Sequence, residues 1–509
     1  MRAIGHRRNS KSSIAVVICV AAAMLAVWLP STAAARGAPA VAPYGGGSHT
    51  YVVKPNGVDD TANIQAALNK CTSNTPQCIV QLVKGTYYIS QLTVYGFRGS
   101  FLGAGQGATI LQGLPNLPAP NAAYDTPTVP FWAGLPGPTN PWPVLLTFVN
   151  GAFAVTGMTV TDTYANPTVG WTYLSGGTFT WLWAGVLVTG TQAIASFDHI
   201  TVVGGAGDLI TGVGNPSTFD ISNGINIEGM LLPTGWTDPF ADQIPLSGSF
   251  DVTNSASDYS ADAVWIENLA SASVLVCFNS IDSSPEPGIA DVSNSQILFC
   301  GNRVTNVPDF TGFGVAQSYL KSNLQPSTVY VVGNYFGVNW YGSGPSAFDY
   351  GPLFWGLPST LNLVVTGNVI VTDTSCGCYS IGTSDVFISV ALASAVFSGN
   401  YLVGGGGGIT VNNYYGGLNT GPVTVVGNTV IGADVGIWIN DVNGAQIAKN
   451  LVKNSLSYGI VVVGGSSNTM VIRNGVSGSG LYDLYWDGTG TGNVWTGNVC
   501  TTSSPPGLC

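Results

Sequence analysis

The chain has 509 residues, of which only 8% are charged and 68 are glycine, and its formal net charge is −11. A mean hydropathy of +0.31 suits tight turns, small polar faces and a long apolar core. The acidic balance argues against nucleic acid and anionic membrane surfaces as partners, because both require clustered Lys and Arg side chains.

The N-terminus has the three parts of a secretory signal peptide. A basic head over residues 1–11 precedes an apolar run over residues 14–29 and then small residues up to Ala35. The apolar run is short for a membrane-spanning helix. We therefore expect a signal peptide at 1–35, an exported protein that is secreted or periplasmic, and no membrane association after cleavage.

The mature chain is expected to open with a flexible leader at 36–50, which is rich in Gly, Ala and Pro, and to continue as one domain at 51–509. Asp60 or Thr61 can cap a short amphipathic helix over about 60–71. Such a helix would cover the open end of a core that begins after it. The pair Asp59 and Asp60 is thus interpreted as a turn and a cap rather than a catalytic dyad.

Residues 113–150 interrupt the strand pattern, since nine prolines fall between Pro115 and Pro143. Proline removes a backbone donor, so this stretch predicts a long inserted loop. Trp181 and Trp183 follow soon after it. Their side chains either stack on sugar rings or pin the loop to the neighbouring strands, and the sequence leaves both interpretations open.

From about residue 277 onward, one short phrase with an asparagine between apolar residues returns at intervals of 22 to 34 residues. The repeated asparagines are Asn279, Asn302, Asn334, Asn368, Asn400, Asn428, Asn450, Asn474 and Asn498. This period predicts an all-β solenoid, a single right-handed parallel β-helix. Asparagine tolerates a left-handed backbone and can bond the equivalent amide of the next coil, so its role here is interpreted as structural.

Eight cysteines remain after removal of Cys19 with the signal peptide, and an even number in an exported chain indicates disulfides. Proximity predicts the pairs Cys71–Cys78, Cys277–Cys300 and Cys500–Cys509. A fourth pair, Cys376–Cys378, would close a small, strained ring. A zinc site is not expected, because the body of the chain has few histidines.

Acid–base chemistry on a glycan requires positioned carboxyl groups, and the chain has three glutamates, at 228, 267 and 286. If Val264 and Ile266 face the core, Trp265 and Glu267 point outward together. The same alternation turns Asn226 and Glu228 outward. With residues 229–255 as an inserted loop, the two glutamates would stand on neighbouring strands, at a spacing used for glycoside hydrolysis.

Three more residues complete the predicted site. Asp258 and Asp262 could lie at the corner that precedes the strand of Glu267. His199, beside Asp198, could add a proton relay one or two coils earlier. The alternative for the whole set is a group of solvent-facing polar residues on a stacked sheet.

Residues 57–68, 85–89 and 99–105 resemble the opening of the pectate-lyase-like superfamily, in particular the pectate lyase superfamily domain and proteins related to family 28 glycoside hydrolases. The resemblance implies an exported β-helix that acts on polysaccharides by hydrolysis or β-elimination. Asp262 matches one of the family's paired aspartates, but alanine precedes it where the second belongs. The glycine-histidine-glycine and arginine-x-lysine elements of family 28 are absent as well.

These observations together predict a polysaccharide as the partner, neutral or weakly acidic because the protein is itself negative. Hydrolysis is favoured over a lyase reaction, and no cofactor is expected except calcium in the case of a lyase. The remaining alternative is a non-catalytic solenoid that binds glycan at the cell surface or is structural. The sequence leaves the oligomeric state open.

Overall fold

The computed structural model describes residues 49–71, 78–90, 92–114, 144–161, 170–172, 178–180, 184–203, 223–228, 245–258, 262–282, 288–305, 314–316, 325–338, 360–372, 384–388, 392–412 and 421–509. The expected signal peptide, most of the leader, Trp181, Trp183, Cys376 and Cys378 lie outside these ranges. Within them, no helix is long and apolar enough to cross a membrane.

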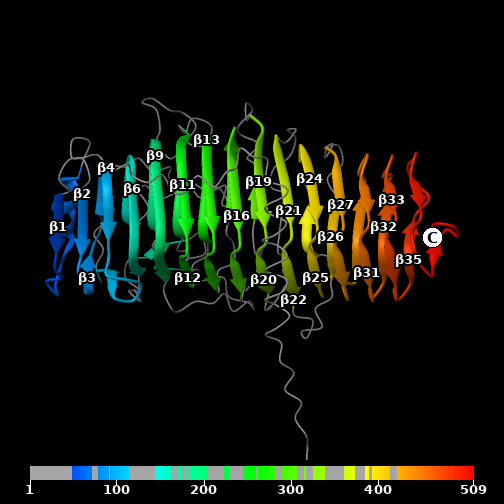
Figure 1. The fold of residues 1–509 in the computed structure, drawn as a ribbon, viewed down its shortest axis with the longest axis horizontal. Coiled ribbons are helices and arrows are strands. Elements are labelled where there is room, and N and C mark those ends of the chain that lie inside the picture. The colour runs from blue at the N-terminus through cyan, green and yellow to red at the C-terminus, as the bar shows by residue number, and fades with distance from the viewer. Residues whose placement is uncertain are drawn as a thin grey trace, which may run out of the picture. The chain divides into compact units, whose positions relative to one another are not determined.

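Short strands recur along the chain in a fixed order of three faces, here named A, B and C, and each strand pairs in parallel with its equivalent in the next coil (Figure 1). Parallel crossovers of this kind are right-handed. The protein is therefore the predicted right-handed parallel β-helix. β7 (Gly170–Thr172) and β8 (Thr178–Thr180) form a separate antiparallel pair.

Four long strands bend from face A into face B, namely β4 (Leu92–Leu102), β6 (Val144–Thr161), β9 (Ala184–Val203) and β13 (Asp262–Cys277), and β6 and β9 continue into face C. Face A also contains β10 (Asn223–Glu228), β15 (Gly288–Ser293), β18 (Gly314–Ala316), β23 (Ser384–Ile388), β26 (Gly407–Asn412), β29 (Val435–Asn440), β32 (Tyr458–Val463), β35 (Tyr482–Trp486) and β37 (Ser503–Ser504).

Face B also contains β1 (His49–Val53), β2 (Cys78–Leu82), β11 (Leu246–Thr253), β16 (Gln296–Cys300), β19 (Ser327–Val332), β21 (Leu361–Thr366), β24 (Ser394–Ser398), β27 (Val423–Val426), β30 (Gln446–Ala448), β33 (Met470–Ile472) and β36 (Val494–Thr496). Face C also contains β3 (Gly85–Ile89), β5 (Thr109–Gly113), β12 (Ala256–Asp258), β14 (Ser280–Asp282), β17 (Arg303–Thr305), β20 (Tyr335–Val338), β22 (Val369–Thr372), β25 (Tyr401–Val403), β28 (Thr429–Ile431), β31 (Leu451–Lys453) and β34 (Gly475–Ser477).

Alternate residues of these strands fill one continuous core. In β21, for example, Leu361, Leu363 and Val365 are buried while the residues between them are partly exposed. Equivalent positions of successive coils stack, as the buried register partners Val329, Leu363 and Ala395 do on face B. The period-2 pattern of the sequence thus becomes one apolar column along the coils.

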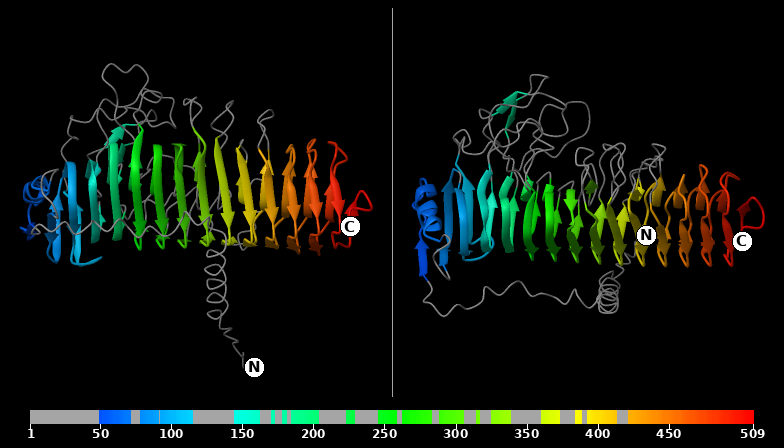
Figure 2. Two further views of the ribbon diagram at one scale, coloured as in Figure 1. Left: turned by 45° about the horizontal axis from the view of Figure 1, so that its top comes forward. Right: turned by 90° about the horizontal axis from the view of Figure 1, so that it is seen from above.

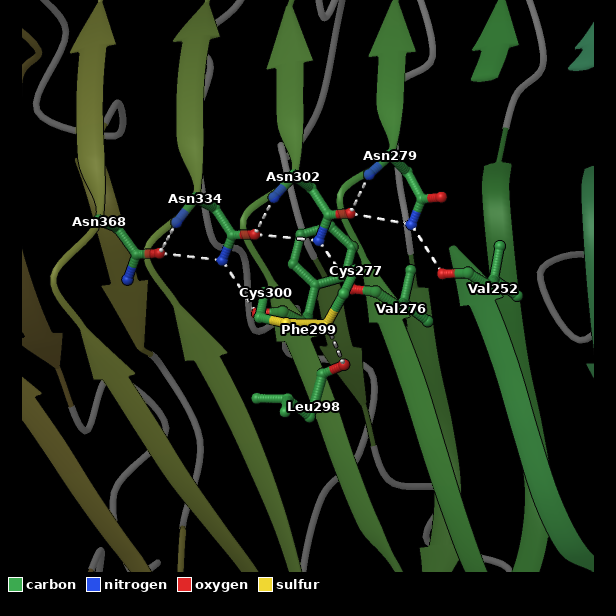
Figure 3. The surroundings of a disulfide bond; sticks show 10 residues. All are labelled: Val252, Val276, Cys277, Asn279, Leu298, Phe299, Cys300, Asn302, Asn334 and Asn368. Carbon is green, nitrogen blue, oxygen red and sulfur yellow. Dashed lines mark hydrogen bonds between the residues drawn. A yellow bond between two sulfur atoms is a disulfide. The ribbon is translucent and has the colours of Figure 1, made fainter. Parts of the chain in front are cut away.

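The repeated asparagines form a hydrogen-bonded ladder at the corner between faces B and C (Figure 3). At one rung, the backbone N–H and the side-chain Nδ2 of Asn302 both donate to Oδ1 of Asn334, at 2.9 and 3.0 Å. Nδ2 also donates to the carbonyl oxygen of Val276, at 2.8 Å. All nine asparagines are buried. The structural interpretation of the repeat is confirmed.

Three of the predicted disulfides are present: Cys71–Cys78, Cys277–Cys300 and Cys500–Cys509. Cys277 and Cys300 are register partners on adjacent strands of face B, immediately before the ladder (Figure 3). Because the coil repeat sets this register, two cysteines beside consecutive repeated asparagines face each other. The fourth predicted pair falls on residues outside the described ranges.

Helix α2 (Thr61–Asn69) lies at the N-terminal end, where it buries Ile64, Ala67 and Leu68 (Figure 2). The cap covers the first strand edge of each face. The side chain of Gln65 bonds both backbone groups of Thr93 on face A, and β1 pairs with β2 on face B. On face C, the backbone N–H of Asp60 donates to the carbonyl of Tyr88.

Asp60 occupies the N-cap position, but its carboxylate makes no capping hydrogen bond. It is fully buried and instead accepts from the backbone N–H groups of Asn56 and Tyr88. Asp59 accepts from the backbone N–H of Thr61. The pair therefore fixes the turn into the helix, in agreement with a structural rather than a catalytic role.

The C-terminal tail closes the other end. Buried Asp483 accepts from the backbone N–H groups of Thr501 and Thr502, and β37 pairs with β35. The last rung of the ladder, Asn498, donates to the carbonyl oxygen of Leu508 at 3.3 Å. Both edges of the stack are thus covered by chain from outside the regular coils.

The connections between strands vary most in length next to face A. From β13 onward, just two residues separate each face B strand from its face C partner, as between Cys277 and Ser280. Longer connections, such as residues 306–313, 373–383 and 413–422, lead into or out of face A. Face A is consequently the part of the coil whose surroundings differ most from one repeat to the next.

Candidate functional site

Trp265 and Glu267 lie together on the outer side of face A. Val264 and Ile266 are buried in the core, so the residues that alternate with them point outward, as predicted. Trp265 Nε1 donates a hydrogen bond to Glu267 Oε2 at 2.8 Å, and both side chains are half-buried. The indole therefore holds the carboxylate in one orientation and presents an apolar ring beside it.

The neighbouring strand β10 brings the other predicted pair into register. Asn226 is the register partner of Trp265, and Glu228 is that of Glu267. The prediction that the two glutamates occupy adjacent coils is confirmed at the level of the backbone. The side chains of Asn226 and Glu228 lie outside the described part of the structure.

The prediction of one inserted loop over residues 229–255 was wrong. Residues 246–253 form β11 on face B, and residues 256–258 form β12 on face C of the same coil. Phe250 and Val252 fill the core there. Ser, Gly and Asp occupy the remaining positions of β11, so the apolar alternation that marks a strand is hard to recognise in the sequence. Only residues 229–244 of the predicted loop lie outside the described residues.

Small residues follow Trp265 and Glu267 on the C-terminal side. Their register partners are Gly288 and Ala290 of β15. On the N-terminal side, Thr147, Leu187 and Thr189 are buried even though they alternate with core residues. The outward residues of face A are therefore buried in β6 and β9 and partly exposed in β13. The next strand, β15, has glycine and alanine at the corresponding positions.

Asp258 and Asp262 lie where predicted, at the corner before this strand. Asp258 ends β12 on face C and Asp262 begins β13 on face A. Asp262 is the register partner of Asn223. Their side chains are outside the described set, so the structure assigns them a position in the coil but no contacts.

His199 lies at the corner between faces B and C of β9, whereas Glu267 lies on face A. That corner does not border face A, so the structure does not bring His199 to the two glutamates. Its Nδ1 is 2.8 Å from Asp198 Oδ2, and Asp198 Oδ1 accepts from Thr253 and Asn254. Burial raises the pKa of Asp198, but these hydrogen bonds outweigh burial and leave the pKa below its usual value.

The lowered pKa predicts an acid-sensitive contribution to stability. A carboxylate whose pKa is lower in the folded than in the unfolded state stabilises the fold above the unfolded pKa of about 3.9, and this contribution disappears as the pH falls through the folded pKa. We expect Asp198→Asn to have a lower Tm than the wild type at pH 7, with the two values converging toward pH 3.

Thermal unfolding followed by circular dichroism at several pH values measures this convergence. Asp251→Asn provides a control of opposite sign, because burial raises the pKa of Asp251 and its ionised form costs stability at neutral pH. A Tm difference for Asp198→Asn that stays constant with pH would contradict the assignment.

The described residues contain no group of three or more His, Cys, Asp or Glu side chains placed to hold a metal ion. Arg303 lies on face C with its guanidinium 5.0 Å from the ring centroid of Tyr335. It is thus turned away from Trp265 and Glu267.

Two features escaped the sequence analysis. Asp251 has a carboxyl group with a raised pKa, but it points outward from face B and does not join the glutamates. Tyr458, Tyr482 and Tyr485 cluster on face A near the C-terminus. The tyrosine cluster could have been predicted from the sequence, because Tyr458 and Tyr482 are one coil period of 24 residues apart.

No protein-family model matches the sequence, and a comparison with curated proteins finds no match. Among solved structures, the chain is similar to the Dettilon tailspike protein (gp208), with 12% identity, a TM-score of 0.45 and coverage of 89% of this chain and 68% of that one. It is similar to the GH87 alpha-1,3-glucanase catalytic unit of Streptomyces thermodiastaticus strain HF3-3, with 14% identity, a TM-score of 0.38 and coverage of 90% and 70%. It is also similar to the polygalacturonase of Erwinia carotovora ssp. carotovora, with 13% identity, a TM-score of 0.33 and coverage of 89% and 96%.

Proposed function

We propose that the protein is an exported glycoside hydrolase that cleaves a neutral or weakly acidic polysaccharide on face A, with Glu228 and Glu267 as the catalytic carboxyl groups. The observation that carries the proposal is their register on adjacent strands, next to the hydrogen-bonded indole of Trp265. Adjacent parallel strands lie about 4.8 Å apart, so two outward side chains there can reach the roughly 5–10 Å separation that glycoside hydrolysis uses.

The chemistry follows from two carboxyl groups in one place. Two like charges this close do not both ionise readily, so one group keeps its proton at a pH where the other is a carboxylate. The protonated group gives its proton to the glycosidic oxygen as the bond breaks. The carboxylate either activates water or attacks the sugar carbon itself, and the separation of the two groups decides between inversion and retention.

The surroundings suit a sugar chain. The ring of Trp265 offers a flat apolar surface, and the register partners of Trp265 and Glu267 on the next coil are Gly288 and Ala290. An exported setting is supported by the three disulfides, which form and persist in oxidising compartments. The net charge of −11 disfavours a strongly anionic polymer.

A non-catalytic glycan-binding role is the second candidate. The hydrogen bond from Trp265 to Glu267 favours it, because a carboxylate held by an indole can bind a sugar hydroxyl without transferring a proton.

The test is an assay of the full mature chain on a panel of plant and bacterial polysaccharides, with and without calcium. Release of reducing ends without the ultraviolet absorbance of an unsaturated uronate is the expected result. Both signals together, dependent on calcium, would replace hydrolysis by lyase chemistry. No product from any polysaccharide, combined with retention on an immobilised glycan, would leave the binding role in its place.

A further inference from the structure

We propose that the C-terminal end of face A contains a second glycan-binding site, an aromatic platform formed by Trp438, Tyr458, Tyr482 and Tyr485, which holds an uncharged stretch of polysaccharide away from the proposed catalytic pair. The nature of the ligand rests on the proposed function. We call these four residues the C-terminal platform.

Register places Trp438 and Tyr485 in one row, and ring contacts join Tyr458 and Tyr482, at the starts of their strands, to Tyr485. Tyr458 of β32 is the partner of Tyr482 of β35, and Trp438 of β29 follows the same row as Tyr485, with Val461 between them. The core positions beside this row are the buried residues Ile437, Ile460 and Leu484. By strand alternation, the row of Trp438 and Tyr485 therefore faces outward.

The three tyrosine rings form one contact group. The ring centroids of Tyr458 and Tyr482 are 6.4 Å apart with their planes 24° from parallel, and those of Tyr482 and Tyr485 are 6.2 Å apart at 26°. Tyr458 and Tyr485 are closer, at 5.1 Å. Tyr482 is 37% exposed, and Leu481 beside it is 55% exposed. A cluster of partly exposed aromatic and aliphatic side chains is a type of surface at which another molecule can bind.

Polar groups border the platform on both sides. Asn440 Nδ2 donates to Asn412 Oδ1 at 2.7 Å along one edge, and Ser457 Oγ donates to Asp434 Oδ1 at 2.5 Å along the other. Trp438 adds an indole N–H that is buried and has no hydrogen-bond acceptor in the described structure.

This combination of groups selects the ligand class. Sugar rings have apolar C–H faces that lie on aromatic rings and hydroxyl edges that bond amides and carboxylates. The platform and its two borders contain no Lys or Arg, and Asp434 supplies a carboxylate. A polyanion would be repelled there, so the structure favours a neutral glycan.

The platform is well separated from the proposed catalytic pair. Seven coil steps on face B connect β13 to β33, which belongs to the same coil as β32. At about 4.8 Å per step this is roughly 34 Å. One polysaccharide molecule can therefore occupy both sites only if it is long enough to span this distance; otherwise the platform binds a separate molecule. In either case, binding to the platform can be measured without turnover.

The experiment compares three proteins and one further variant, the double phenylalanine variant named below, all carrying Glu267→Gln to suppress turnover. They are the otherwise unchanged chain, the double variant Tyr458→Ala/Tyr482→Ala, and the control Tyr401→Ala, which removes an exposed tyrosine from face C. Retention in affinity gel electrophoresis is measured with dextran, hydroxyethylcellulose, galactomannan and polygalacturonate. Thermal unfolding checks that each variant is folded, and Tyr458→Phe/Tyr482→Phe keeps the rings without the hydroxyls.

We expect at least one neutral polymer to retain the unchanged chain and the control alike, with retention about tenfold weaker in the double alanine variant. The double phenylalanine variant should retain most of the binding, and polygalacturonate should retain none of the proteins. Equal retention of the double alanine variant and the control would overturn the proposal, as would absence of retention by all the neutral polymers. Retention and thermal unfolding are both independent of turnover. Failure of the platform hypothesis therefore does not contradict the hydrolase hypothesis, and failure of the hydrolase hypothesis does not contradict the presence of the platform.

Discussion

Replacement of Glu267 by glutamine is expected to reduce polysaccharide turnover by roughly 10²- to 10⁴-fold, the usual contribution of a positioned general acid or base. Glutamine keeps the shape of the side chain and can still accept the hydrogen bond from Trp265 Nε1. It cannot ionise or give up a proton in the reaction. The Tm should therefore stay near that of the wild type while the rate falls.

Glu228→Gln is expected to behave in the same way, because hydrolysis needs both carboxyl groups. Asp251→Asn serves as the matched control, since this half-buried carboxyl group is on face B and should leave turnover unchanged. The measurement is the initial rate of reducing-end release at saturating substrate, with Tm recorded for each variant. Wild-type rates in both glutamine variants would move the catalytic site away from β10 and β13.

The second large effect is expected at the ladder. Asn368 is completely buried; its Nδ2 donates to Asn400 and to the carbonyl of Val331, and its Oδ1 accepts from the backbone and side chain of Asn334. Asn368→Ala removes these bonds and leaves several enclosed polar groups without partners. At about 1–3 kcal/mol for each, we expect a loss of roughly 3–5 kcal/mol in the free energy of unfolding.

Asn362→Ala is the control for this change. Asn362 is half-buried on face B and makes one donor bond, to the carbonyl of Ser327 at 3.2 Å, and one acceptor bond from Ser394. Its replacement should cost less than about 1 kcal/mol, as is usual away from the core. Denaturant unfolding midpoints compare the two variants. A similar shift for both would mean that the ladder contributes no more than an ordinary surface hydrogen bond.

The sequence predicted the fold because the coil repeats a local rule. One buried asparagine per coil fixes the corner between faces B and C, and alternation on either side fixes which residues face the core. The same register accounts for the disulfide between Cys277 and Cys300 and for the pairing of Glu228 with Glu267. The disulfide depends on this repeat, and the pairing of the two glutamates, which precede the first repeated asparagine, depends on alternation; a single sequence displays both.

Other parts of the site could not be predicted, since they depend on which face a segment occupies. His199 follows a strand-like pattern, but the pattern is the same on all three faces, and only the complete coil order places it away from Glu267. In β11 the outward positions carry Ser and Asp, so the strand resembles a loop. The hydrogen bonds of Asp60 to Asn56 and Tyr88 depend on tertiary contacts that helix-capping rules do not include.

Because the hydrogen bonds between successive asparagines all run in one direction, the two ends of the coil stack differ in their hydrogen-bonding groups. Every asparagine-to-asparagine bond from Asn279 onward runs from the amide of one rung to the Oδ1 of the next, so the first rung presents an acceptor, used by the backbone N–H of Ser255, and the last presents a donor. Two copies of such a stack could extend each other only head to tail, which is the geometry of an open filament. The carbonyl of Leu508 takes up the final donor. The tail thus occupies the edge to which a second copy would otherwise add, in a structure whose repeat has no intrinsic length limit.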